Sequence, residues 1–62
     1  MIRLTRLNGQ EVVVNADLIE FLESTPETIV SMTTGKKVVV RENIADVIRL
    51  VAVFRARIMP VV

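Results

Sequence analysis

The sequence predicts an α+β domain in which a small twisted antiparallel β-sheet precedes one C-terminal amphipathic helix. Three observations favour this fold class. Two extended, β-branched runs each surround a turn dipeptide, Asn8-Gly9 in the first and Thr34-Gly35 in the second. After Asn43 the hydrophobic period changes from two to 3.6. We therefore expect a single domain over residues 1–62, with two hairpins and about four or five strands in residues 2–42 and a helix at residues 44–59.

The Asn8-Gly9 dipeptide predicts the first hairpin. Asn-Gly is preferred in two-residue type I′ turns, because both central residues of that turn take positive φ. This turn predicts the cross-strand pairs Arg6–Glu11, Thr5–Val12, Leu4–Val13 and Arg3–Val14. Side-chain alternation along the paired strands then places Ile2, Leu4 and Val13 on the core-facing side.

A turn and an ambiguous apolar segment follow the first hairpin. Asn15 and Asp17 are residue types that hydrogen-bond their own backbone and turn the chain. Residues 18–23 suit either one helical turn or a strand, and we favour a strand that leads into a turn at Pro26.

The second hairpin is predicted from residues 29–33 and 37–41, which flank Thr34-Gly35. Its second strand contains three consecutive valines, and this β-branched character is typical of a buried strand.

The helix is predicted to begin after Asn43, a good N-cap, and to stop before Pro60. Asp46 at the third helical position completes an approximate capping box. On a helical wheel, one apolar stripe, expected to lie across the sheet, contains Ile44, Val47, Ile48, Val51, Phe54 and Ile58. The predicted core consists of Ile2, Leu4, Val13, Phe21, Val39, Val51 and Phe54.

A second, smaller apolar strip is the candidate interaction site. Leu50 and Val53 fall on the side of the wheel opposite the stripe, beside Arg49 and Arg57. An isolated domain would leave this strip in water, so we interpret these four residues as a contact for another subunit or partner. The alternative is that the two aliphatic side chains are ordinary scattered surface residues.

Size and composition favour self-association. Hydrophobic residues make up 52% of the chain, and the mean hydropathy is +0.52. Burial in a domain of this size contributes roughly 90 kcal/mol, and ordering the chain costs roughly the same. With no Cys to form a disulfide, we expect a homo-oligomer, although a well-packed monomer is the alternative.

The composition does not suit an enzyme. The chain has no His and no Cys, which perform most general-base, nucleophilic and transition-metal chemistry, and we expect no catalytic residue, cofactor, metal or small-molecule substrate. Thr34-Gly35-Lys36-Lys37 lacks the first glycine of a phosphate-binding loop and lies between two strands, so it is a hairpin turn. The clustered carboxylates, which we interpret as a solvated acidic edge or alternatively as a docking strip for a basic partner, are Asp17, Glu20, Glu23 and Glu27.

Nucleic-acid and membrane binding are weaker alternatives. The net charge is only +1, and the two aromatic residues, Phe21 and Phe54, are predicted to lie in the core, so base stacking is unsupported. Peripheral membrane contact through the helix arginines lacks aromatic anchors. The absence of Cys fits the reducing cytoplasm.

The order of these segments resembles a known family. The segments that carry the resemblance are Leu4-Thr5-Arg6-Leu7-Asn8-Gly9, Val14-Asn15-Ala16-Asp17-Leu18-Ile19-Glu20, Glu23-Ser24-Thr25-Pro26-Glu27-Thr28 and Thr33-Thr34-Gly35-Lys36-Lys37-Val38-Val39-Val40, followed by a short helix. Together they are similar to the FlbD/SwrD family of small bacterial flagellar proteins, over residues 1 to about 58. The apolar tail, residues 58–62, departs from relatives that continue with charged residues.

The resemblance implies a non-enzymatic accessory role in flagellar motility. It implies support of swarming through increased motor power, by contact with stator-related or basal-body proteins at the cytoplasmic face of the motor. A nucleic-acid-binding regulator of flagellar genes is the alternative function.

Overall fold

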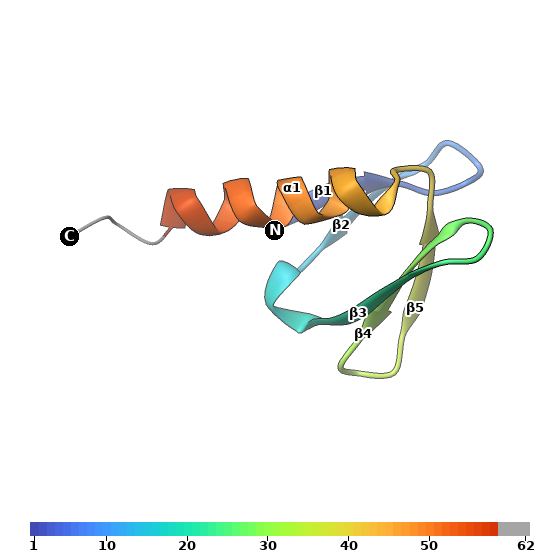
Figure 1. Ribbon diagram of the computed structural model, residues 1–62, viewed down its shortest axis with the longest axis horizontal. Coiled ribbons are helices and arrows are strands. Elements are labelled where there is room, and N and C mark those ends of the chain that lie inside the picture. Colours follow the sequence, from blue (N-terminus) through green and yellow to red (C-terminus); the bar gives the residue numbers. More distant parts are fainter. Residues whose placement is uncertain (59–62) are drawn as a thin grey trace.

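The computed structural model describes residues 1–58 and shows two small antiparallel sheets with one C-terminal helix (Figure 1). The α+β class is therefore confirmed, but the strands form a two-stranded and a three-stranded sheet, with strand orders β1-β2 and β3-β4-β5. The elements are β1 Ile2–Thr5, β2 Glu11–Val14, a 3₁₀ turn η1 Ala16–Leu18, β3 Ile19–Ser24, β4 Thr28–Met32, β5 Lys37–Val40 and α1 Ile44–Ile58. A single bridge between Arg6 and Val40 connects the two sheets.

The first hairpin forms at the predicted place but with a different turn. Within residues 1–58 only glycines have positive φ, so Gly9 (φ +93°) is left-handed and Asn8 is not, and the predicted type I′ turn is wrong. The loop has three residues instead of two, and it is closed by hydrogen bonds from the Arg6 N–H to the Gln10 carbonyl and from the Gly9 N–H to the Arg6 carbonyl. The strand register therefore shifts by one residue, so that Ile2 lies opposite Val14. Because of this shift Val14 is buried, whereas Val13, predicted to be in the core, is 52% exposed.

The second hairpin repeats the construction of the first. Its turn also places a glycine, Gly35 (φ +91°), after two residues that are not left-handed. The backbone N–H of Met32 donates to the Lys36 carbonyl (2.8 Å), as that of Arg6 donates to the Gln10 carbonyl (2.8 Å). Residues 5–14 and 31–40 align without a gap, each ending in three valines. The fold therefore contains two copies of one hairpin unit, a correspondence that our sequence analysis did not identify.

The ambiguous segment is a strand, as favoured. Asn15 Oδ1 accepts the backbone N–H of Asp17 (3.0 Å) and closes η1, after which β3 begins. The pairing of β3 with β4 shifts between Ile19 and Phe21, and this irregularity leaves Glu20 without a partner on β4. Phe21 is 47% exposed, so its predicted place in the core is wrong.

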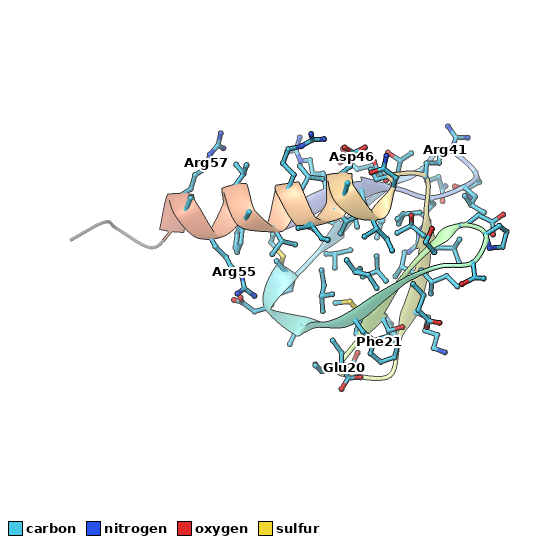
Figure 2. All side chains as sticks on the ribbon, in the orientation of Figure 1. Glu20, Phe21, Arg41, Asp46, Arg55 and Arg57 are labelled. Carbon is cyan, nitrogen blue, oxygen red and sulfur yellow. The ribbon has the colours of Figure 1, made fainter. Side chains whose placement is uncertain are left out.

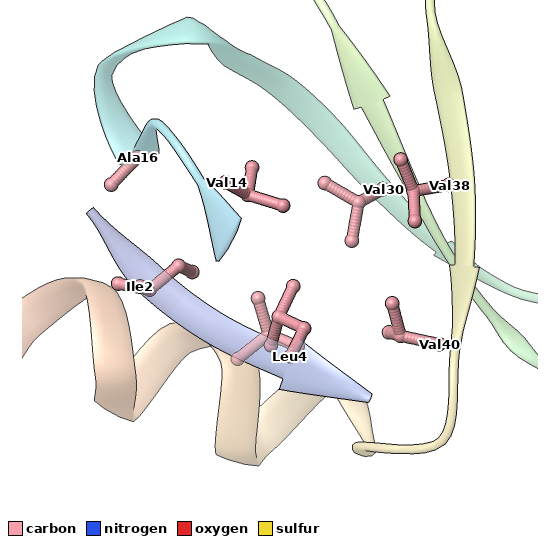
Figure 3. Close-up of a cluster of buried hydrophobic side chains, with 8 residues drawn as sticks. Ile2, Leu4, Val14, Ala16, Val30, Val38 and Val40 are labelled. Carbon is pink, nitrogen blue, oxygen red and sulfur yellow. The ribbon is translucent and has the colours of Figure 1, made fainter. Parts of the chain in front are cut away.

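The core lies between the two sheets and under the first half of α1 (Figure 3). Ile2 and Leu4 are buried as predicted, whereas Val39 is 37% exposed because its neighbours in β5 face inward. Val51 and Phe54 are half-buried against this cluster. The buried apolar residues are Ile2, Leu4, Val14, Ala16, Val30, Val38, Val40 and Val47.

Helix α1 begins at the predicted cap. Asn43 Oδ1 accepts the backbone N–H of Asp46 (2.8 Å), and the Asn43 carbonyl accepts that of Val47 (3.0 Å). The Asp46 carboxylate contacts Arg49 on the helix surface, so the described hydrogen bonds form only half of the predicted capping box. The helix reaches Ile58, whose side chain lies outside the described part of the chain, as does the predicted last helical residue, Met59.

The buried side of α1 is rotated from the predicted stripe. Val47 is fully buried, but Ile48, predicted to face the sheet, is 56% exposed. Leu50, predicted to lie on the opposite side, is half-buried and packs against the core. The physical reason is that α1 crosses two sheets instead of one, with β1 on one flank and β3 on the other. The partly buried residues of α1 are therefore divided between its two sides, with Leu50 and Phe54 toward β1 and Val51 toward β3.

A polar clamp joins the first hairpin to the start of the helix. The Thr5 backbone N–H and hydroxyl donate to the two oxygens of the Glu42 carboxylate, both at 2.9 Å. Partial burial raises the pKa of this carboxyl, but hydrogen bonds from Thr5 and from its own backbone N–H, together with the charge of Arg41, outweigh that effect and lower it. The Arg41 guanidinium also donates to the Leu7 carbonyl (2.8 Å), so the hairpin turn is held against the end of β5.

Candidate interaction surfaces

The described residues expose a large amount of apolar surface for so small a core. Eight apolar residues form the buried core, and eight large ones are exposed. Three of the exposed ones lie along the two sides of α1: Ile48 (56% exposed) and Val53 (44%) on the helix itself, and Phe21 (47%) on the neighbouring strand β3. Apolar surface gathered beside one element is typical of a contact site.

One flank of α1 forms a groove with β1, called here the basic groove. It has a volume of about 290 Å³ and is lined by Met1, Ile2, Arg3, Leu50, Val53, Phe54 and Arg57. Leu50 and Phe54 are half-buried and form its floor, while Val53 is exposed. Among these described lining residues, both charged side chains, Arg3 and Arg57, are cationic.

Three of the four residues predicted for the interaction strip therefore lie together. Leu50, Val53 and Arg57 line the basic groove, but Arg49 does not, because it contacts Asp46 on another part of the helix surface. Arg3 was not predicted as a site residue, although alternation along the first strand places it between two buried positions and therefore outside the core.

The other flank of α1 forms a groove with β3, called here the β3 groove. It has a volume of about 390 Å³, and its lining residues are Ala16, Ile19, Glu20, Phe21, Leu22, Ile44, Ile48, Val51 and Arg55. Its exposed apolar side chains are Phe21 and Ile48. The Arg55 guanidinium lies 4.0 Å from the Asp17 carboxylate, while Glu20 lines the groove itself. Sequence reasoning missed this site because it assigned both apolar residues to the interior.

A third groove, called here the valine groove, has a volume of about 620 Å³ and contains Met1, Arg6, Val12, Val13, Val14, Asn15, Leu18, Met32, Thr34, Lys36, Lys37 and Val38. Its floor is mostly apolar, and its charged lining residues are all basic. Neither aromatic residue, Phe21 nor Phe54, lies along it, so it offers no aromatic platform on which a base would stack.

The remaining predicted residues have structural places. Asn8 and Gly9 form the first hairpin turn, Thr34 and Gly35 form the second, and Asn43 caps α1. Within residues 1–58 no three metal-ligating side chains are grouped closely enough to hold an ion. No helix in that range has the length and apolar character needed to cross a bilayer.

Comparison with known proteins places the chain in a family. The family model described as flagellar and swarming motility proteins, FlbD, matches residues 1–59 of the 62 residues. Searches of curated proteins and of solved structures found no significant match. Since the family model covers nearly the whole chain, this protein belongs to the FlbD family of flagellar and swarming motility proteins.

Proposed function

We propose that this protein is a non-enzymatic accessory factor of flagellar motility that acts by binding other proteins of the flagellar motor or basal body. Family membership supports the motility role. The observation that carries the mode of action is the exposure of Ile48, Phe21 and Val53 along the two flanks of one helix. The resemblance to the FlbD/SwrD family further implies that the partner is a stator-related protein and that binding increases motor power during swarming.

The two flanking grooves suit a protein partner better than a small substrate. Their linings are mainly aliphatic, with charged side chains at Arg3 and Arg57 on one flank and at Glu20 and Arg55 on the other. Specific small-molecule sites instead combine an apolar pocket with several convergent polar groups. An apolar centre with a charged rim is the usual anatomy of a protein–protein contact. We place this contact at the cytoplasmic face of the motor, without a cofactor.

The proposal is tested by complementation of a deletion strain. Val53→Asp and Ile48→Asp each introduce a charge on an exposed flank, and Leu7→Asp is the matched control in a hairpin turn outside all three grooves. We expect at least one flank variant to lose swarm expansion and tethered-cell torque, with normal protein level and filament number, while Leu7→Asp restores both. Full rescue by both flank variants would refute the proposed mode of action.

A second candidate function, regulation of flagellar genes through nucleic-acid binding, is supported by the three cations of the valine groove, Arg6, Lys36 and Lys37. Phosphate contacts by these residues would give duplex binding that weakens steeply with salt. A gel-shift titration with micromolar protein at about 50 mM salt tests this function, since non-specific binders usually retain affinity there. Binding that is lost in Lys36→Glu/Lys37→Glu would support it, and no shift would exclude it.

A further inference from the structure

We infer that copies of this chain associate head to tail, with the acidic β3 strand of one copy seated in the basic groove of the next. This inference goes beyond the proposed function, because it names the occupant of the groove and the segment that fills it. Charge complementarity and exposed apolar anchors on two separate surfaces of the same molecule carry it.

The basic groove requires an apolar segment that carries negative charge. Leu50 and Phe54 provide an apolar floor that is half-buried, and Val53 adds an exposed aliphatic side chain. Arg3 and Arg57 border this floor and are both exposed. A segment with an apolar anchor between carboxylates would cover the floor and pair with both arginines.

Strand β3 supplies such a segment. It is one of the two edge strands of the three-stranded sheet, and its sequence around the pairing irregularity is Glu20-Phe21-Leu22-Glu23. Phe21 is 47% exposed, and both glutamates are exposed. An exposed aromatic side chain on an edge strand is a ready anchor for another chain.

The positions of the two surfaces favour an intermolecular contact. Arg57 and Phe21 lie on opposite sides of the molecule (Figure 2), so the β3 strand of one copy does not fill the groove of the same copy. A two-fold pairing of basic grooves would bring Arg3 and Arg57 against arginines of the partner, which like-charge repulsion opposes. The complementary surfaces therefore favour a heterologous contact, which closes into a ring or extends as a filament.

The test uses two variants that each disable one half of the contact. Val53→Asp places a carboxylate in the basic groove, and Phe21→Asp removes the strand anchor; Leu7→Asp, which changes a side chain of similar exposure, is the control. Far-ultraviolet circular dichroism checks that all three variants are folded. Light scattering over a concentration series gives the mass of each protein relative to the 7.0 kDa monomer.

We expect the wild type and Leu7→Asp to exceed the monomer mass, and each groove or strand variant alone to be monomeric. Mixing Val53→Asp with Phe21→Asp should restore one contact, from the intact β3 strand of the first to the intact basic groove of the second. The mixture should therefore reach a 1:1 dimer, twice the mass of one chain, and raising the salt should dissociate it.

Three outcomes would overturn the inference. These are a wild type that stays monomeric, a Phe21→Asp variant that keeps the wild-type mass, and a mixture that stays monomeric. Retention of mass by Phe21→Asp with loss in Val53→Asp would indicate a two-fold contact through the groove alone. A monomeric wild type whose Val53→Asp variant still fails to swarm would leave the proposed function standing, because the groove would then bind a different motility protein.

Discussion

Replacement of Val47 by alanine tests which side of α1 holds the fold together. The Val47 side chain is fully buried. Removing two buried carbon atoms costs about 1.6 kcal/mol at ~0.8 kcal/mol each, and the remaining cavity adds to this. Alanine returns roughly 0.5 kcal/mol of helix propensity. The expected net loss is about 1.5–2.5 kcal/mol, a large fraction of the roughly 3–9 kcal/mol expected for a chain of this length.

Ile48→Ala is the matched control one residue further along the same helix. It removes three carbon atoms instead of two, so at equal burial it would be the more damaging substitution. Because Ile48 is 56% exposed, we expect a loss of only about 0.5 kcal/mol after the gain in helix propensity. Urea unfolding followed by circular dichroism gives the loss of unfolding free energy for both variants. Measurements at two protein concentrations separate the stability of the fold from any contribution of self-association. A loss for Ile48→Ala equal to or larger than that for Val47→Ala would refute the observed helix orientation.

Substitutions at three further positions test the clamp, the second turn and the core. Glu42→Gln should cost about 1 kcal/mol at neutral pH through weaker bonds to Thr5. Since the pKa of Glu42 is lowered from its ordinary value of 4.5, the charged carboxylate stabilises the fold at pH values above 4.5. In urea titrations the difference in unfolding free energy between the wild type and Glu42→Gln should therefore disappear as the pH falls through the folded-state pKa. Gly35→Ala should cost about 1 kcal/mol through its positive φ alone, because nothing lies within 4 Å of an added Cβ, and Gly35→Asn should cost less in the same assay. Ser31→Ala should raise the melting temperature by several degrees, since the buried Ser31 hydroxyl has no hydrogen-bond partner among the described residues.

Local sequence signals predicted where most elements begin and end. Asn43 marks the start of α1 because its side chain caps the helix through a hydrogen bond three residues away, a short-range interaction. Asn15 similarly predicts the turn before β3, and its side chain closes that turn. These signals predict the structure correctly because each hydrogen bond joins residues only two or three positions apart, so its two groups are brought together by the local sequence alone.

The register of the first hairpin was not predictable from its dipeptide. Asn8-Gly9 fits a two-residue loop with two left-handed residues and also a three-residue loop with one, and these differ by one residue in pairing. The clamp favours the longer loop, because it holds Thr5 beside Glu42 and the Leu7 carbonyl beside Arg41. Both contacts span more than 30 positions in the sequence, so no local pattern contains them.

The orientation of α1 likewise depends on contacts between distant elements. A helical wheel assumes one flat surface beneath the helix, whereas α1 lies over the junction of two sheets. Leu50 therefore joins the core from the β1 side, and Ile48 remains exposed beside β3. The prediction of the interaction strip was partly right, because Val53 and Arg57 lie further along α1 on the same β1 flank as Leu50.

The excess of exposed apolar surface follows from how this small fold is assembled. The strands of each hairpin unit are only four or five residues long. Strand β5 buries one face only, since Val38 and Val40 are buried and Val39 is not. One helix covers the junction between the two units but cannot also cover both of its own flanks. Exposed apolar side chains on both flanks of one helix are typical of surfaces that bind other proteins, and this is the physical ground on which we propose protein binding as the mode of action.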